Sequence, residues 1–238
     1  MSLFIAYADI TQDYPLHLMG NINLPENFYI KNSRQKHRQV GYFLLWQLLQ
    51  QSSLPENLLS QIYRIKNGRP CFNVDHIDFN LSHSGNWVAV ILSVQKEGVK
   101  AWTGIDIEHV TKKRNYIALL DHFGTKDEIF WLKKSINVER DFYQIWCLRE
   151  AILKVEGVGI RKLNSIKNFP QQCVMMTNYC PQGNAFFYSK LPFYLAFFCQ
   201  KEEAQISIFQ WQQNMLIQQK LKKDFCYNIN PTLPTRVD

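Results

Sequence analysis

Strand-like and helix-like segments occur twice along this 238-residue chain, in two stretches of roughly 100 residues each. Short apolar or alternating runs predict strands, and apolar residues at i, i+3, i+4 and i+7 predict helices. No Ser-, Gly- or Pro-rich linker separates the two stretches. We therefore expect an α+β fold of two packed halves, residues 1–102 and 103–238, that form one globular unit. The expected strands cover residues 3–8, 78–81, 87–94, 103–107, 184–188, 194–199 and 204–211, and the expected helices cover residues 35–51, 54–62, 115–123, 126–134 and 141–155.

Local signals set the expected boundaries of several of these segments. Ser53 is expected to cap the helix at residues 54–62, and Gly157 to end the helix at residues 141–155. Residues 82–85 read as a loop that joins two strands, and the tail from Tyr227 reads as loosely held because it contains prolines.

Composition excludes several classes of protein. Hydrophobic residues make up 46% of the chain, which is enough to bury a core and unlike a disordered sequence. The longest uncharged apolar runs reach roughly ten residues, about half of what a membrane-spanning helix needs. The amino terminus lacks a basic region followed by an apolar run, so we expect a cytoplasmic protein. The six cysteines contain no Cys-x-x-Cys pair and are expected to be free thiols.

The formal charge of +7 is spread over both halves of the chain rather than gathered in one basic arm. An even excess is a weak signal for nucleic acid and a better one for an acidic partner or a phosphate-bearing ligand. A basic nucleic-acid-binding module, or a metal-dependent nuclease, remains the alternative function at this point.

Two acids stand two residues apart in the segment 103–108. Because side chains of a strand alternate, Asp106 and Glu108 are expected on one face and Ile105 and Ile107 on the other. Two neighbouring carboxylates repel each other unless a cation lies between them, and Mg²⁺ is commonly held by one or two carboxylates and substrate phosphates. The alternative is an edge strand with two solvated acids.

The helix at residues 141–155 carries a second unusual face. At about 100° per residue, Trp146, Glu150 and Lys154 fall opposite the apolar stripe. Glu150 and Lys154 alone would be an ordinary surface pair. With an aromatic residue beside them, this face equally fits the wall of a cleft.

Ser82, His83 and Ser84 precede a glycine and together offer several hydrogen-bond donors to phosphate oxygens. A serine–histidine nucleophilic couple is the other interpretation, but the Gly-x-Ser-x-Gly elbow is absent. Residues 31–38 contain four basic side chains and no acid, which fits either a phosphate-binding edge or a solvated helix start.

In this order, the motifs resemble the 4′-phosphopantetheinyl transferase superfamily, specifically its longer, monomeric, surfactin-synthetase-activating type. The resemblance runs from Arg38 to Gly159, about half of the chain. Its motifs are Gly68-Arg-Pro70, Phe79-Asn-Leu-Ser-His-Ser84, Gly104-Ile-Asp-Ile-Glu108 and Trp146-x-x-Arg-Glu-Ala-x-x-Lys154, followed by Gly157-x-Gly159.

The resemblance implies a fold of two similar halves related by a pseudo-twofold axis, with coenzyme A in the cleft between them. It also implies the reaction: a serine hydroxyl of an apo acyl or peptidyl carrier protein attacks the β-phosphorus of coenzyme A. The 4′-phosphopantetheine arm is transferred and 3′,5′-ADP leaves. Such chemistry needs a cation on the pyrophosphate, donors for the phosphate oxygens and a base for the serine.

The resemblance also implies roles for single residues. Asp106, Glu108 and Glu150 match the carboxylates that hold Mg²⁺, and Glu150 is the preferred general base, directly or through a metal-bound water. Lys154 matches the lysine that neutralises the pyrophosphate. The positions that match contacts to the phosphates or adenine of coenzyme A are Arg38, Arg69, Pro70, Ser82 and His83, with His83 at the 3′-phosphate; charge alone adds Lys31 and Arg34.

The sequence departs from the family pattern at Arg69 and Arg149, where lysine is usual. Both keep the positive charge, so we expect anion binding to survive with altered geometry. Asp127 stands near a family glutamate sometimes assigned as the base, and the alignment can slip by one residue onto Glu128. The expected partner is an acidic carrier protein that docks on a positive surface, for which the segment 112–114 is a guess.

Overall fold

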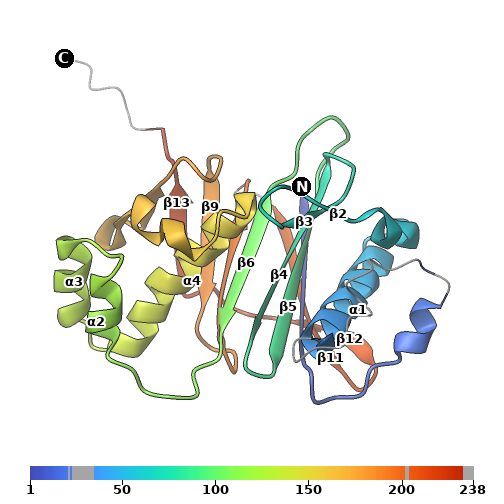
Figure 1. The fold of residues 1–238 in the computed structure, drawn as a ribbon, viewed down its shortest axis with the longest axis horizontal. Helices are drawn as coiled ribbons and strands as arrows, with labels where there is room; N and C mark the ends of the chain where they lie inside the picture. The colour runs from blue at the N-terminus through green and yellow to red at the C-terminus, as the bar shows by residue number, and fades with distance from the viewer. Residues whose placement is uncertain (21, 23–34, 202–203, 233–238) are drawn as a thin grey trace.

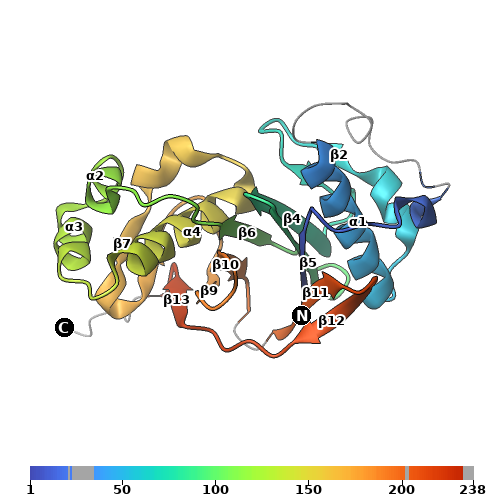
Figure 2. The ribbon, with the colours of Figure 1, turned by 90° about the horizontal axis from the view of Figure 1, so that it is seen from below.

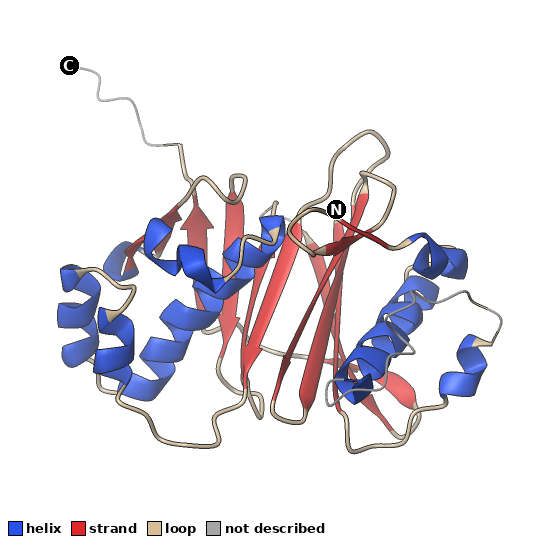
Figure 3. Cartoon of the chain, viewed as in Figure 1, coloured by secondary structure: helices blue, strands red, loops and turns tan. Residues whose placement is uncertain are grey.

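The computed structural model of the chain describes residues 1–20, 22, 35–201 and 204–232. Helices and strands are mixed along the chain and gather into two sheets, each covered by helices (Figures 1 and 3), so the α+β prediction is confirmed. The predicted Lys31 and Arg34 lie outside the described residues. No helix of the described residues has the length and apolar character needed to cross a membrane.

The first sheet has the strand order β12-β11-β1-β5-β4. Its members are β1 (Ser2–Asp9), β4 (Ile77–Ser84), β5 (Trp87–Val94), β11 (Gln205–Gln212) and β12 (Met215–Gln219). β1 pairs parallel with β11 and antiparallel with β5. The helix α1 (Gln35–Gln51) packs on this sheet and buries most of its length in the core.

The second sheet has the order β6-β10-β9-β13-β8-β7. Its strands are β6 (Thr103–Glu108), β7 (Lys167–Phe169), β8 (Val174–Met176), β9 (Gly183–Tyr188), β10 (Tyr194–Cys199) and β13 (Phe225–Ile229). The long helix α4 (Val138–Glu156) packs on β6, β9 and β10, and the shorter α2 (Tyr116–Asp121) and α3 (Lys126–Lys133) lie beyond it. Asn137 caps α4 at its start, and Gly157, with φ of 71°, ends it as predicted.

A third apolar core joins the two sheets. It contains side chains of β1 and β5 from the first sheet and of β6, β9 and β10 from the second. Figure 2 shows the two sheets meeting at β4 and β6, with α1 and α4 on either side. The two sheets therefore bury one face against helices and part of the other face against each other.

Side chains close the seam between β4 and β6, which belong to different sheets. Four alternate residues of β4 accept hydrogen bonds from alternate backbone N–H groups of β6 and the residue after it. The pairs are Asp78 with Thr103, Asn80 with Ile105, Ser82 with Ile107, and Ser84 with His109, at 2.9, 3.4, 3.2 and 3.0 Å. We call this set the seam ladder. It satisfies buried N–H groups that a neighbouring backbone would satisfy in a continuous sheet.

Three local predictions were wrong. Residues 82–84 continue β4 rather than forming a loop, because the hairpin to β5 turns within Gly85 and Asn86. The segment at 54–62 is a 3₁₀ helix, η3 (Glu56–Gln61), and no side chain caps it. The first residues of the tail, 227–229, belong to β13 (Phe225–Ile229), and Tyr227 is fully buried.

The division at residue 102 does not separate the two sheets. β11 and β12 follow residue 103 in the chain but pair within the first sheet, as Figure 2 shows beside β5 and the N-terminus. The small hairpin of β2 (Tyr63–Arg64) and β3 (Pro70–Cys71) forms a separate two-stranded sheet, with Gly68 in the turn between its strands.

Candidate active site

The two acids of β6 lie on one face of the strand, as the alternation predicted. Asp106 is 3% exposed and Glu108 is half-buried. Ile105 and Ile107 point the other way, into the core between the sheets. β6 is the edge strand of its sheet, but the alternative of two solvated surface acids is wrong because Asp106 is buried and Glu108 is half-buried.

A glycine lets the helix α4 approach this strand closely. A Cβ atom at Gly104 would lie 2.1 Å from the carbonyl oxygen of Ala151, on the middle of α4. Only glycine permits this approach, which places the inner turns of α4 beside the carboxylates of β6.

Trp146, Glu150 and Lys154 line up along α4 at this place, and all three are half-buried. The Lys154 ammonium donates to Asp106 Oδ1 at 2.6 Å and to Ser82 Oγ at 2.8 Å. The indole N–H of Trp146 donates to Glu108 Oε1 at 3.0 Å. The face is thus the wall of a site, and Lys154 pairs with Asp106 rather than forming the surface pair with Glu150.

Both carboxylate oxygens of Glu108 are held. Besides the contact from Trp146, Ser84 Oγ donates to Glu108 Oε2 at 3.0 Å. Ser82 Oγ likewise lies 2.9 Å from Asp106 Oδ1. Two serines of the seam ladder therefore also fix the two acids of β6.

The cluster is short of positive charge. Burial, followed by the charges of Asp106 and Glu108, raises the pKa of Glu150 to about 8, although Lys154 opposes this. Burial and then Asp106 also raise the pKa of Glu108. Burial lowers the pKa of Lys154, but the charges of Asp106 and Glu150 outweigh it and the net shift is upward. Three carboxylates thus share one ammonium.

These residues fit a hard divalent cation in charge and in donor type. The donors are carboxylate oxygens, which Mg²⁺ prefers. Asp106 Oδ2 is buried and has no hydrogen-bond partner among the described residues. Within that part of the chain, no three or more His, Cys, Asp or Glu side chains are arranged so that they could hold a metal ion, so the fit is one of charge and donor type and not of geometry. In the structure, the positive charge next to Asp106 is the ammonium of Lys154.

A cleft of about 420 Å³ extends from Lys154 along β4 to the hairpin of β2 and β3, and the described residues that line it do not include Asp106, Glu108 or Glu150. Its volume falls within the range of roughly 300–1,000 Å³ typical of small-molecule sites. Six predicted residues line it together, namely Arg38, Arg69, Pro70, Ser82, His83 and Lys154. His37 lines it as well, with its ring 4.8 Å from that of His83.

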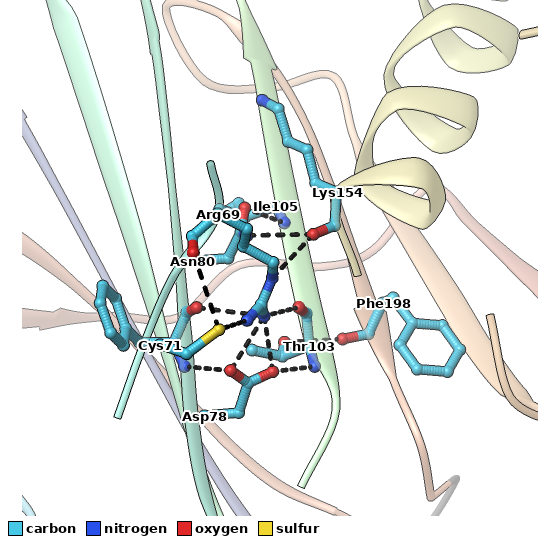
Figure 4. Close-up of polar contacts among 9 residues, drawn as sticks. Arg69, Cys71, Asp78, Asn80, Thr103, Ile105, Lys154 and Phe198 are labelled. Atoms are coloured by element: carbon cyan, nitrogen blue, oxygen red, sulfur yellow. Dashed lines mark hydrogen bonds and ion pairs between the residues drawn. The ribbon is translucent and has the colours of Figure 1, made fainter. Parts of the chain in front are cut away.

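Arg69 reaches this cleft, but its guanidinium points into the protein (Figure 4). Nη2 donates to both carboxylate oxygens of Asp78, at 2.9 and 2.7 Å, and Nη1 donates to Cys71 Sγ. Nε donates to the carbonyl oxygen of Lys154 at 2.9 Å. Each nitrogen is bound inside the protein, so the predicted contact of Arg69 with a ligand phosphate does not match this arrangement.

Arg149 is fully buried and forms a two-pronged ion pair with Glu128, at 2.6 and 2.9 Å. The expectation that Arg149 binds an anion is therefore wrong. Glu128 also forms a capping box with Thr125 at the start of α3. Burial raises the pKa of Glu128, but the pairing with Arg149 prevails and lowers it below its usual value.

The ion pair with Arg149 thus excludes Glu128, the alternative to Asp127, as the general base. Asp127 lines a different groove, with Phe130, Trp131 and Phe169. Of the acids considered as a base, Glu150 is the one placed at the carboxylate cluster.

The sequence interpretation missed the roles of Asp78, Asn80 and Ser84. The signal was present, because polar residues occur at every second position from Asp78 to Ser84. Read as a strand to its end, this segment would have predicted one polar face.

Basic and hydroxyl side chains line a cleft next to a carboxylate cluster, an arrangement of charge and donors that suits a phosphate-bearing ligand. The family model of the 4′-phosphopantetheinyl transferase superfamily matches residues 103–209. The chain is 42% identical over 237 residues to the Haemophilus influenzae protein named "Putative 4'-phosphopantetheinyl transferase", covering 97% of this chain and all of that protein. It is 33% identical over 96 residues to the Bacillus subtilis 4′-phosphopantetheinyl transferase Sfp, covering 39% of each. It is 30% identical over 124 residues to the Salmonella typhi 4′-phosphopantetheinyl transferase AcpT, covering 48% of this chain and 56% of that protein.

The chain belongs to the 4′-phosphopantetheinyl transferase superfamily. It is a transferase by that membership, as the sequence motifs implied.

Proposed function

We propose that this enzyme transfers the 4′-phosphopantetheine arm of coenzyme A to a serine of an apo carrier protein and releases 3′,5′-ADP. The observation that carries the proposal is the cluster of Asp106, Glu108, Glu150 and Lys154, which Lys154 joins to a basic cleft. The proposal includes dependence on Mg²⁺, held by the three carboxylates of that cluster. When bound there, Mg²⁺ supplies positive charge to the pyrophosphate.

In this proposal, the cleft binds the phosphate groups of coenzyme A. Lys154 and Ser82 stand at the carboxylate end, where their donors face a pyrophosphate. Arg38 and His83 line the same cleft and donate to further phosphate oxygens. Pro70 follows the hairpin turn and lines the wall of the cleft.

In the transfer step, the carrier serine oxygen bonds to the β-phosphorus while the bond from that phosphorus to the bridging oxygen breaks. The electron pair leaves with 3′,5′-ADP. Glu150 accepts the serine proton, and its carboxylate must be ionised before the step. Lys154 stabilises the negative charge that grows on the phosphate oxygens.

The partner in this proposal is an acidic acyl or peptidyl carrier protein. Lys112, Lys113 and Arg114 are exposed on the loop after β6, the strand that carries two of the acids. A positive loop there would steer an acidic partner toward the site.

The test is intact-mass spectrometry of an apo carrier protein incubated with the enzyme, coenzyme A and Mg²⁺. We expect a mass gain of one phosphopantetheine arm, and no gain when EDTA is added. Absence of a gain for both acyl and peptidyl carriers, under conditions where a known transferase modifies them, would contradict the proposal.

A further inference from the structure

The main-chain carbonyl oxygen of Lys154 lies in the last turn of α4, where a helix cannot bond all of its own carbonyl groups. In a continuing helix, the N–H of Val158 would donate to this oxygen. Gly157 turns the chain out of the helix with φ of 71°, and the N–H of Val158 donates to the carbonyl oxygen of Leu153 instead, at 3.2 Å. The Lys154 carbonyl therefore needs a donor from outside α4.

Arg69 supplies that donor from the β2–β3 hairpin. Its Nε lies 2.9 Å from the carbonyl oxygen of Lys154, and a cation suits the negative end of a helix dipole. The contact is close, because a Cβ atom at Gly157 would lie 2.8 Å from the Cβ of Arg69. The guanidinium thus caps the helix that carries Glu150 and Lys154.

Asp78 fixes the direction of this guanidinium (Figure 4). Both residues are buried, and Nη2 of Arg69 donates to the two carboxylate oxygens of Asp78 at 2.9 and 2.7 Å. The main-chain N–H groups of Phe79 and Thr103 each donate to Asp78 at 2.9 Å. Asp78 is therefore tied to β4 and β6 at once, and it transmits their position to the guanidinium.

We propose that Asp78 and Arg69 form a positioning pair for Lys154. Asp78 orients the guanidinium, and the guanidinium holds the last turn of α4, so that the Lys154 ammonium meets Asp106. The proposal rests on the proposed function, in which Lys154 stabilises charge in the transfer step. It differs from a contact of Arg69 with a ligand phosphate, because loss of a ligand contact weakens binding, whereas a displaced Lys154 slows the transfer step.

Arg69→Lys tests the link to Lys154 with the charge kept. An ammonium is a compact point charge, so it can pair with Asp78 but cannot also reach the carbonyl oxygen of Lys154. We expect kcat to fall about tenfold, with KM for coenzyme A within about twofold of the wild type. The loss is partial because Asn80 still donates to the same oxygen. A raised KM with an unchanged kcat would overturn the proposal and support the phosphate contact.

A double-mutant cycle shows whether the effect passes through Lys154. In Lys154→Gln, the ammonium that the pair positions is gone, so adding Arg69→Lys should lower kcat by less than about twofold more. A general disturbance of the site would give the same loss in both backgrounds, which would contradict the positioning role.

Asp78→Asn tests the other member of the pair, with Asp141→Asn as the matched control. Asp141 is also buried and paired with an arginine, Arg140, but it lies in the first turn of α4, at the opposite end of the helix. Both substitutions should lower stability. Only Asp78→Asn should lower kcat by more than about twofold, and an equal kcat in the two variants would count against the pair. If Asp78→Asn does not fold, Arg69→Lys still decides.

Nuclear magnetic resonance of the lysine ammonium groups tests the pair without the transfer reaction. In the ¹⁵N-labelled full chain, the Lys154 signal is identified by its absence from Lys154→Gln. We expect this signal to shift in Arg69→Lys, because the ammonium no longer meets Asp106 in the same geometry, and an unchanged signal would overturn the proposal. If the wild type modified no carrier, the proposed function would fail, but this signal would still show whether Arg69 positions Lys154.

Discussion

Arg69 donates from Nε to the main-chain carbonyl oxygen of Lys154, at 2.9 Å. The bond joins the β2–β3 hairpin to the last turn of α4, and Asn80 donates to the same oxygen at 3.3 Å (Figure 4). The side chain of Lys154 then extends in the other direction, to Asp106. Arg69 thus acts on the site through the position of Lys154.

Removing one carboxylate from the cluster is expected to abolish Mg²⁺-dependent transfer while the fold is kept. Asp106→Asn removes the charge that pairs with Lys154, and Glu150→Gln removes the proposed base. Circular dichroism and thermal unfolding should show a folded protein, and the carrier mass assay should show no product. Wild-type turnover in either variant would contradict the metal assignment.

Mg²⁺ binding is expected to release a proton near pH 7. Without metal, the pKa of Glu150 is about 8, so its carboxyl is largely protonated at pH 7 and must ionise to bind the cation. The apparent affinity should therefore rise with pH and level off above about pH 8. Titration calorimetry in buffers of different ionisation enthalpy measures the proton count, and Glu150→Gln should remove it.

The same pKa shift predicts how stability depends on pH without metal. The folded-state pKa lies above the value near 4.5 of an unperturbed glutamate. The folded state therefore binds more protons between these two values, so stability should fall as pH rises from about 4.5 to 8. The fall should be smaller in Glu150→Gln, measured by urea unfolding with EDTA present. An identical pH profile for both proteins would contradict the shift.

His83→Ala is expected to raise KM for coenzyme A with little change in kcat. The side chain is exposed in the cleft and lies against His37, away from the carboxylates that its strand neighbours contact. Loss of one donor to a bound phosphate should weaken binding roughly tenfold. An unchanged KM would remove His83 from the ligand site.

Ser84→Ala is expected to weaken Mg²⁺ binding roughly tenfold to 100-fold, because it frees one oxygen of Glu108 and removes a rung of the seam ladder. Ser84→Thr keeps the hydroxyl and should restore the affinity. Equal Mg²⁺ affinity in Ser84→Ala and in the wild type would show that Ser84 does not position Glu108.

Arg149→Met is expected to destabilise the protein by about 3–5 kcal/mol, because it leaves the fully buried Glu128 without its partner. Replacing both residues, as Arg149→Met with Glu128→Leu, should recover much of that loss. Denaturant unfolding measures both. A stable Arg149→Met variant with impaired coenzyme A binding would instead support the anion-binding role that the sequence suggested.

The helices and strands predicted best from the sequence are those whose apolar pattern lies within one short segment of the chain. The helix at residues 35–51 and the strand at 194–199 have the predicted bounds. β13 was missed because lysines precede it and prolines follow it, and its pairing partners β8 and β9 lie elsewhere in the chain. Nothing local to Phe225–Ile229 indicates that it completes a sheet.

The site was predictable where one element carries the pattern. The two-residue repeat of a strand predicted that Asp106 and Glu108 lie on one face of β6. The helical repeat predicted that Trp146, Glu150 and Lys154 lie on one face of α4. The direction of Arg69 was not predictable, because its partners lie on β3, β4, β6 and α4 and meet only in the folded chain. Charge alone did not show that the guanidinium of Arg69 is committed to a buried partner.

Because of the seam ladder, the alignment of the two sheets depends on which side chains β4 carries. In a backbone ladder, every residue offers the same carbonyl, so a strand that slips along its neighbour can find new partners. A slip of one residue along β4 would bring Phe79, Leu81 and His83 toward β6, and the first two have no acceptor. The chain can therefore misalign this junction only by losing bonds, which keeps Ser82 beside Asp106 and Ser84 beside Glu108 whenever the two sheets come together.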